Sequence, residues 1–454
     1  MTVAPQKSSS GLNHSARRVE SADGAIPHKQ LPELSRDRSF WAMAITQFLG
    51  AFNDNLFKQL ILLLATPTLA QAAAGSAKDV QSNAQFVFAA AFLIFSGFAG
   101  YLSDRYSKSR IVVICKVAEI FVALMGMIGF LLFDRIGVNG MFFVLFLMGM
   151  HSAFFGPAKY GILPEMIRAN DLPRANGLFL MLTFLAIIFG MALAGALLIV
   201  FQHERIWLGS LACIVIAILG TAASLFIRRL PPANANLKYD WSCWLIPRQT
   251  LQLMMRNKQL LAAVIVVAIF WMVGGVVLQT VNALGKTQLG LNELQTSVLN
   301  VAIGLGTAVG CVLGGYLSHG RINRSVVVGG AIGTVVSLIL MSLPGGHHNH
   351  LLGFYGSIPI LMLLGTFSGM FIVPVQVSLQ SLPPPDEKGR MIATMNQFSW
   401  VGVILGAIVY KMCIPILDTT GWPRASIFAV TAILMLPVAI FYRPKDEQLA
   451  DAAG

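Results

Sequence analysis

The sequence predicts an all-α integral membrane protein whose twelve transmembrane helices form two six-helix halves. Of its 454 residues, 56% are hydrophobic and only 11% are charged, whereas soluble domains carry about 25% charged residues. Apolar runs long enough to span a membrane recur twelve times along the chain. A short motif in the first half also recurs in the second half. Together these observations predict a duplicated, polytopic membrane protein.

The spans follow from length, because a bilayer core of about 30 Å requires about 20 apolar residues in a helix. The predicted spans are 40–65, 84–103, 111–133, 139–157, 177–201, 207–227, 259–283, 294–317, 325–343, 354–379, 391–413 and 425–442. An even number of spans places both chain ends on one side. The connections on that side hold 24 Lys and Arg residues and those on the other side hold five. Since cytoplasmic loops are enriched in these cations, we expect cytoplasmic termini. The net charge of +12 then reflects topology, and no nucleic-acid partner is expected.

The polar stretches divide the chain into five parts. We expect a disordered cytoplasmic tail over 1–38, a six-helix bundle over 39–228, a cytoplasmic connection over 229–258, a second bundle over 259–443 and a cytoplasmic tail over 444–454. The connection carries Trp241 and Trp244, which indicate either an amphipathic segment at the membrane interface or ordinary packing. The five cysteines show no paired metal-ligand spacing, so we expect no disulfide, metal or cofactor.

Two short repeats relate the halves. Residues 100–104 read Gly-Tyr-Leu-Ser-Asp and residues 315–319 read Gly-Tyr-Leu-Ser-His, each at the end of a predicted span. Residues 155–157 read Phe-Gly-Pro, and residues 372–374 read Ile-Val-Pro at the corresponding place. Repeats of this kind are typical of transporters whose substrate site lies near the membrane midplane between two halves.

The first span carries an unusual polar group at Asn53, Asp54, Asn55 and Lys58. A charge at the bilayer centre costs about 2.5–3.5 kcal/mol on insertion scales, and charges within spans often mark a substrate path. Asp54 and Lys58 lie four residues apart on one helical face. They therefore either form an internal ion pair or line a polar cavity.

Other intramembrane polar residues extend this pattern. Lys116 and Glu119 share a face of the third span; Lys116 can reach the interface by snorkelling, whereas Glu119 lies deeper. His151 could relay protons or simply pack. Gln376 is a candidate substrate contact among several uncharged polar groups in the second half. That half is otherwise apolar and rich in glycine, which suits a cavity for an amphiphile with one acyl chain but also suits close helix packing.

Two enzymatic motifs are absent from the sequence. Gly285-Lys286-Thr287 lacks the earlier glycine of a phosphate-binding loop, and no histidine is followed five residues later by the aspartate of a His-x4-Asp acyltransferase. The histidines at 347, 348 and 350 fit a solvated turn better than a metal site. We therefore expect no enzymatic activity.

Residues 100–110, Gly-Tyr-Leu-Ser-Asp-Arg-Tyr-Ser-Lys-Ser-Arg, resemble the loop signature of the major facilitator superfamily, with serine at 107 where the family pattern has glycine. The resemblance implies that Asp104 and Arg105 pair with neighbouring helix ends and hold the cytoplasmic side shut. It implies gating roles for Gly100 and Arg110 as well. A carboxylate at such a place gains from a helix N-terminus and from a cation.

A narrower resemblance lies in residues 48–58, 155–165 and 174–177, with Pro374 and the Gly389-Arg390 turn in the second half. These segments are similar to the bacterial lysophospholipid transporter (LplT) family. The resemblance implies a monomeric secondary transporter of the bacterial inner membrane. It would move lysophospholipids toward the cytoplasmic leaflet by alternating access. The expected partners are the lysophospholipid, membrane lipids and, optionally, a cytoplasmic acyltransferase.

In this hypothesis Lys58 and Lys116 attract the lipid phosphate, while Asn53, Asn55 and Glu119 contact the head group. Asp54 either balances Lys58 or changes protonation during the cycle. Two alternatives stay open: a proton-coupled exporter of drugs or small amphiphiles, and a non-transporting membrane protein that recruits an acyltransferase through its tryptophan-rich central connection.

Overall fold

A computed structural model describes residues 31–65, 81–201, 205, 207–345 and 350–449. Twelve long helices dominate this part of the chain, as the sequence predicts. They are α1 (Arg38–Ala65), α3 (Gln81–Arg105), α4 (Lys108–Leu131), α5 (Phe133–Gly161), α7 (Leu172–Phe201), α8 (Trp207–Ser224), α10 (Lys258–Ala283), α11 (Glu293–Leu317), α12 (Arg324–Ser342), α13 (Gly353–Ser381), α14 (Lys388–Thr420) and α15 (Ser426–Phe441). Within the described residues, ten helices are long and apolar enough to cross a membrane, and α15 is an apolar helix of 16 residues.

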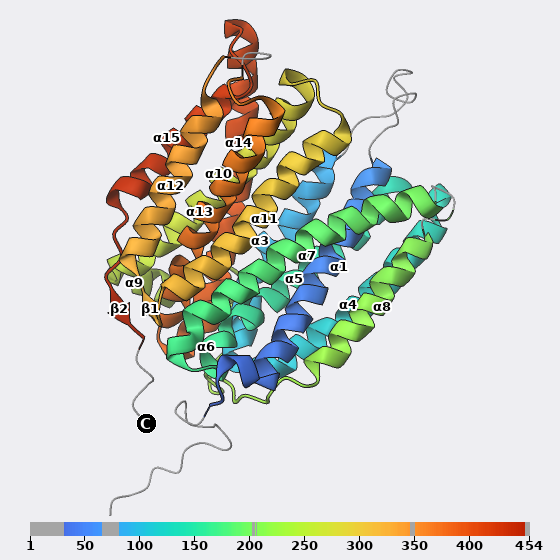
Figure 1. Cartoon of the computed structure of the whole chain (residues 1–454). Coiled ribbons are helices and arrows are strands. Elements are labelled where there is room, and N and C mark those ends of the chain that lie inside the picture. The colour runs from blue at the N-terminus through green and yellow to red at the C-terminus, as the bar shows by residue number, and fades with distance from the viewer. Residues whose placement is uncertain (1–30, 66–80, 202–204, 206, 346–349, 450–454) are drawn as a thin grey trace, which may run out of the picture.

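The long helices form two bundles that lie side by side (Figure 1). Helices α1 to α8 form the first bundle and α10 to α15 form the second. The bundles meet along two seams, where α3 packs on α14 and α7 packs on α11. Leu34, near the described start of the chain, and Leu449, at its described end, share one hydrophobic cluster. We call this end of the molecule the terminal end; it is the lower end in Figure 1.

Short elements gather at the terminal end. They are the short helices α6 (Leu163–Met166) and α9 (Arg248–Arg256), several 3-10 turns, and the strands β1 (Arg321–Ile322) and β2 (Glu447–Gln448). The two strands pair antiparallel, with Arg321 opposite Gln448. This pairing fixes part of the predicted C-terminal tail against the turn between α11 and α12.

Helix starts in the second half follow local sequence signals. The side chains of Asn257, Asn292 and Asn323 each accept hydrogen bonds from the first backbone N–H groups of α10, α11 and α12. An asparagine at this position satisfies amides that the helix itself leaves unpaired. At the other end of α14, Gly421 adopts the left-handed conformation that ends many helices.

Glycines in the second bundle serve close packing. A Cβ on Gly306 would lie 2.1 Å from the Met362 carbonyl oxygen, and one on Gly310 would lie 2.0 Å from that of Thr366. These glycines therefore let α11 and α13 touch along their backbones, a contact that small residues favour in membranes. The packing interpretation of the glycine-rich half is correct at these positions.

Residues 31–38, assigned to the predicted 1–38 tail, are part of the described structure. Leu31 and Leu34 are buried, and Arg228 pairs with Asp37 at 3.0 Å between Nη2 and Oδ1. These residues pack on the first bundle because apolar side chains at 31 and 34 find a core to join. Residues 1–30 and 450–454, and histidines 347 and 348, lie outside the described residues. Between the bundles, α8 ends at Ser224 and α10 begins at Lys258.

Candidate functional site: a gate at the terminal end and a charged network inside the first bundle

Asp104 joins the two bundles at the terminal end of the α3–α14 seam. Its carboxylate accepts hydrogen bonds from the backbone N–H of Gly389 at 2.6 Å and of Arg390 at 3.1 Å, and from Arg390 Nε at 3.0 Å. Asp104 is fully buried. The carboxylate thus meets both the first turn of α14 and a cation, each of which stabilises a negative charge.

Close backbone approach accompanies this contact. A Cβ on Gly100 would lie 2.5 Å from Ala393 Cβ, and one on Gly389 would lie 2.5 Å from Asp104 Oδ1. Only glycine leaves room for the two helices to meet here. The terminal end of this seam is therefore closed, and we call it the gate.

The other residues of the predicted gate lie differently. The Arg105 guanidinium donates a hydrogen bond to the Leu237 carbonyl of the central connection and lies 5.7 Å from the Tyr106 ring centroid. Arg110 is exposed at the start of α4. Arg105 therefore ties the connection to the first bundle, and the cation that meets Asp104 is Arg390.

The second seam, together with the adjoining contact of α7 with α13, is closed by neutral groups. The amides of Asn176 and Gln380 exchange two hydrogen bonds, at 2.7 and 2.9 Å, and both side chains are fully buried. Nearby, a Cβ on Gly177 would lie 2.5 Å from the Cys311 carbonyl oxygen. The repeat motif explains the asymmetry: His319 stands where the first half has Asp104, and it is exposed with its Nδ1 on the Leu317 carbonyl. The two seams are closed by different chemistry.

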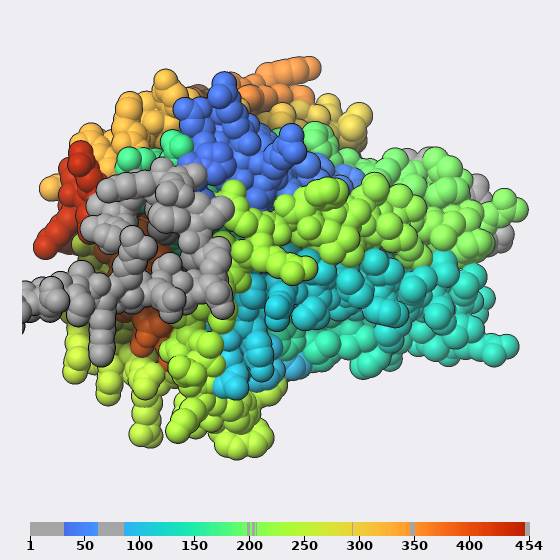
Figure 2. Space-filling view, turned by 90° about the horizontal axis from the view of Figure 1, so that it is seen from below, coloured from blue at the N-terminus to red at the C-terminus, as the bar shows by residue number. Residues whose placement is uncertain are grey.

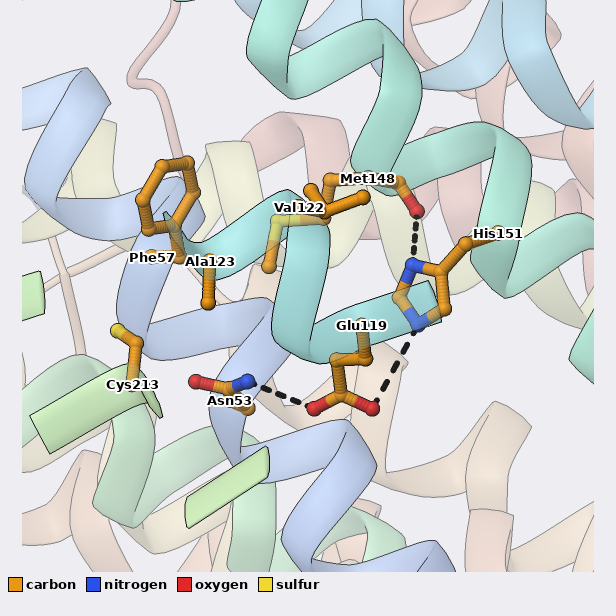
Figure 3. A pocket seen from close by; sticks show the side chains of 8 residues that line it. All are labelled: Asn53, Phe57, Glu119, Val122, Ala123, Met148, His151 and Cys213. Carbon is orange, nitrogen blue, oxygen red and sulfur yellow. Dashed lines mark hydrogen bonds and ion pairs between the residues drawn. The ribbon is translucent and has the colours of Figure 1, made fainter. Parts of the chain in front are cut away.

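A network of buried charges lies inside the first bundle. Glu119 of α4 accepts hydrogen bonds from Asn53 Nδ2 at 2.6 Å and from Lys116 Nζ, and His151 Nε2 lies 3.6 Å from the same carboxylate. Lys116 and Glu119 are 1% and 2% exposed. His151 Nδ1 donates to the Met148 carbonyl at 2.8 Å. Figure 3 shows the Asn53, Glu119 and His151 side chains converging from three helices.

Small residues make space for this network. A Cβ on Gly50 of α1 would lie 3.3 Å from Lys116 Nζ, and one on Gly220 of α8 would lie 2.9 Å from it. The adjoining pocket, lined also by Phe57 and Cys213, holds about 210 Å³ between atoms and no space for a water-sized sphere. Lys116, Glu119 and Asn53 therefore contact one another in a tightly packed interior.

Asp54 faces a different neighbour from Asn53. Its Oδ2 accepts a hydrogen bond from Ser152 Oγ at 2.6 Å, and its Oδ1 is buried without a donor in the described part of the chain. Asp54 and Lys58 do not form an ion pair within these described residues. The internal-pair interpretation is therefore wrong. The amide of Asn55 donates to the Ala51 carbonyl on its own helix.

Lys58 lies beside aromatic rings of the α3–α14 seam. Its Nζ is 5.5 Å from the Phe88 ring centroid. The Phe88 and Phe92 rings lie 5.7 and 4.7 Å from the Trp400 ring of α14. Lys58 is only partly buried. A cation that pairs with no carboxylate of the described residues therefore stands next to rings that both bundles supply.

Lys159 is a further cation that sequence reasoning assigned to a connection. The structure places it inside α5, partly buried, with Nζ 4.9 Å from the Tyr160 ring centroid. Tyr160 itself packs against the cores of both bundles. The Gly-Pro-Ala-Lys segment of residues 156–159, at the end of the fourth predicted span, was the available signal.

Gln376 of α13 is the predicted site residue contributed by the second bundle. It is buried, and its Nε2 has no acceptor among the described residues. Leaving such a donor unpaired costs about 1–3 kcal/mol. This N–H donor is therefore available to a further hydrogen-bond acceptor.

Two repeated bundles, closed against each other at one end and carrying charges within their helices, define a polytopic membrane transporter. The family model described as Major Facilitator Superfamily matches residues 41–407, and the chain belongs to this family. The curated relatives it is similar to are named lysophospholipid transporter LplT. The protein from Photorhabdus laumondii is 27% identical over 413 residues, covering 87% of this chain and 94% of its own. That from Serratia proteamaculans is 26% identical over 390 residues, covering 84% and 89%.

Solved structures agree on the fold. The transporter FucP in its outward conformation matches with a TM-score of 0.68 at 14% identity, covering 88% of this chain and 97% of its own. The proton:xylose symporter XylE matches with a TM-score of 0.65 at 14% identity, covering 89% and 95%. The predicted fold class is confirmed.

Proposed function

We propose that this protein transports lysophospholipids across the bacterial inner membrane, toward the cytoplasmic leaflet, by alternating access. Similarity to lysophospholipid transporters over more than four fifths of the chain supports this proposal. The structural observation that carries it is the partly buried Lys58, a cation with no ion pair among the described residues, beside apolar rings that both bundles contribute. A lysophospholipid offers the complementary pair, a phosphate and a single acyl chain.

The head group would contact the partly buried charges. Lys58 and Lys159 attract the phosphate, since each lacks a carboxylate partner among the described residues. The free Oδ1 of Asp54 accepts from an ammonium or hydroxyl donor, and Gln376 Nε2 donates from the second bundle. The side chains of Lys116, Glu119 and Asn53 pack behind the residues that contact the head group and do not touch the lipid themselves.

The conformational step follows from the gate. The excess of Lys and Arg in the connections at the terminal end supports a cytoplasmic location for that end. With Asp104 and the Asn176–Gln380 pair closed there, the described conformation faces outward. Inward release then requires both seams to separate while the opposite end closes.

The test is lipid movement in liposomes that contain the purified protein. Wild type should move labelled lysophosphatidylethanolamine, whereas D54N and K58Q should each lose most of this activity. D54N keeps the side-chain volume and an oxygen for Ser152, so loss of activity reports the missing charge. K411Q, at an exposed lysine near the opposite end of α14, is the matched control and should transport normally. Equal movement by all four proteins would refute the assigned roles.

One observation favours a second candidate, proton-coupled transport. Glu119 and His151, two groups that exchange protons readily, lie 3.6 Å apart inside the first bundle. Proton-coupled export of small amphiphiles would make wild-type liposomes lose an imposed pH gradient when such compounds are added. A pH gradient that stays unchanged when such compounds are added would exclude this candidate.

A further inference from the structure

The central connection presents apolar side chains at the rim of the terminal end. Trp241 is 76% exposed, Leu245 is 73% exposed and Met255 is 67% exposed; Leu251 is exposed beside Met255, one turn away on α9. We call these four residues the connector ridge. Figure 2 views the terminal end directly, and yellow-green side chains of the connection project sideways there from the rim of the bundle.

The part of the connection around Trp244 lies along the side of α3. A Cβ on Gly97 would lie 2.5 Å from the Cys243 carbonyl oxygen, and the Trp244 ring stacks on Phe98 with centroids 4.7 Å apart. Gly97 is eight residues from the end of α3 at Arg105, about 12 Å along the helix axis. This part of the connection therefore packs against the side of a spanning helix. At this position the outer face of the connection would meet the bilayer interface.

A basic groove continues from the ridge where α9 joins α10. It holds about 620 Å³ and is lined by Arg256, Asn257, Lys258, Gln259 and Lys445. Three cations and two amides form this lining, with no carboxylate. Gln259 Nε2 is buried beside this lining without an acceptor in the described part of the chain.

Lys445 reaches the groove from the other end of the chain. The β1–β2 pairing and a hydrogen bond from the Arg324 backbone N–H to Asp446 Oδ1, at 2.8 Å, fix this segment. The groove is thus assembled from two segments that the fold holds in place, rather than from one run of lysines.

We propose that the connector ridge and basic groove form a binding site for an anionic phospholipid of the leaflet at the terminal end. The phosphate lies in the groove against Arg256, Lys258 and Lys445. The acyl chains lie along Leu251 and Met255, one residue from the groove. This arrangement matches two physical preferences. Tryptophan side chains favour the membrane interface, and clustered cations attract anionic head groups.

This site is separate from the transport pathway described above. The groove lies at the outer rim, whereas Lys58 and Asp54 lie within the helices of the first bundle. Side chains of the connection project sideways from the rim (Figure 2), the direction in which a surrounding bilayer would lie, and this favours the bilayer over a soluble protein as the partner.

Native mass spectrometry of the full-length protein, with added phosphatidylglycerol or phosphatidylethanolamine, tests the proposal. Each cation near an anionic surface contributes about a fivefold gain in affinity, so R256Q/K258Q/K445Q should bind phosphatidylglycerol roughly a hundredfold more weakly than wild type. R174Q/R321Q/R324Q removes the same charge from exposed positions outside the groove and should bind as wild type does. Equal loss of phosphatidylglycerol affinity in both variants would indicate that net charge alone, rather than the groove, binds the lipid, and would overturn the site. Equal retention by both, or no preference for phosphatidylglycerol, would also overturn the site.

Spin labels test the ridge separately. In a background without the five native cysteines, labels at W241C and M255C should be more accessible to oxygen than to a water-soluble nickel complex in phosphatidylglycerol nanodiscs. A label at E447C, on an exposed residue of β2, should show the reverse preference. Labels at 241 and 255 that resemble the one at 447 would refute insertion into the leaflet.

Discussion

The substitution E119Q tests the interpretation of the charged network most sharply. It removes one negative charge and keeps the shape of the side chain. Lys116 then remains a cation at 1% exposure, with a neutral amide oxygen in place of its carboxylate. The substitution therefore separates the ionic contribution from packing.

The size of the effect follows from the geometry. Two unit charges about 3 Å apart attract by about 5 kcal/mol at an effective dielectric constant of about 20. An amide oxygen restores about 1 kcal/mol through a neutral hydrogen bond. The free energy of unfolding should therefore fall by about 3–5 kcal/mol, the range seen when one partner of a buried pair is removed.

Reversible unfolding in mixed micelles with increasing sodium dodecyl sulfate measures this free energy. K116M/E119Q removes both charges and should recover stability to within about 1–2 kcal/mol of wild type, because no buried charge stays unpaired. K411Q is the control for a lysine outside the network and should change stability by no more than about 0.5 kcal/mol. An E119Q protein as stable as K411Q would refute the buried network.

The remaining predictions concern the two seams. D104N should weaken the gate, because Arg390 loses its carboxylate; a spin-label distance across the terminal end should broaden toward larger values. N176A should cost about 1–3 kcal/mol by leaving the Gln380 amide unpaired, whereas N176A/Q380A should cost less than the sum of the two single variants; additive costs would contradict the reciprocal pair. G100V should hold the terminal end apart, since its side chain would meet Ala393, and increased thiol labelling of A393C in that background, relative to A393C alone, measures this. Unchanged labelling would show that the seam has room.

Much of the fold could be predicted from the sequence because its signals are local. Apolar length identified the spanning helices, and the asparagines before α10 to α12 are local start signals. The repeated motif at residues 315–319 predicted that the end of α11 corresponds to the end of α3. The tail boundary at 38 lay too late in the chain. Two leucines in a polar stretch form no apolar run, and the sequence does not show which core they join.

The candidate site was only partly predictable. The polar residues of α1 and α4 stand out in any apolar span, so Asp54, Lys58, Lys116 and Glu119 could be identified as unusual. Helical spacing suggested that Asp54 would pair with Lys58. In the structure Asp54 instead accepts from Ser152, 98 residues away, and spacing within one helix carries no information about such a partner.

The sequence by itself determined that the chain spans a membrane, how many times it does so and that its halves are related, because hydrophobic length and repetition are properties of the chain. Only the tertiary structure decided which polar groups of different helices meet. Glu119 of α4 takes Asn53 of α1 as a partner beside Lys116 of its own helix, and Lys58 is left beside aromatic rings. It also decided that Asp104 meets Arg390, 286 residues away. The physical reason is that electrostatic energy depends on distance and burial in space, and both are set when helices from separate parts of the chain pack together.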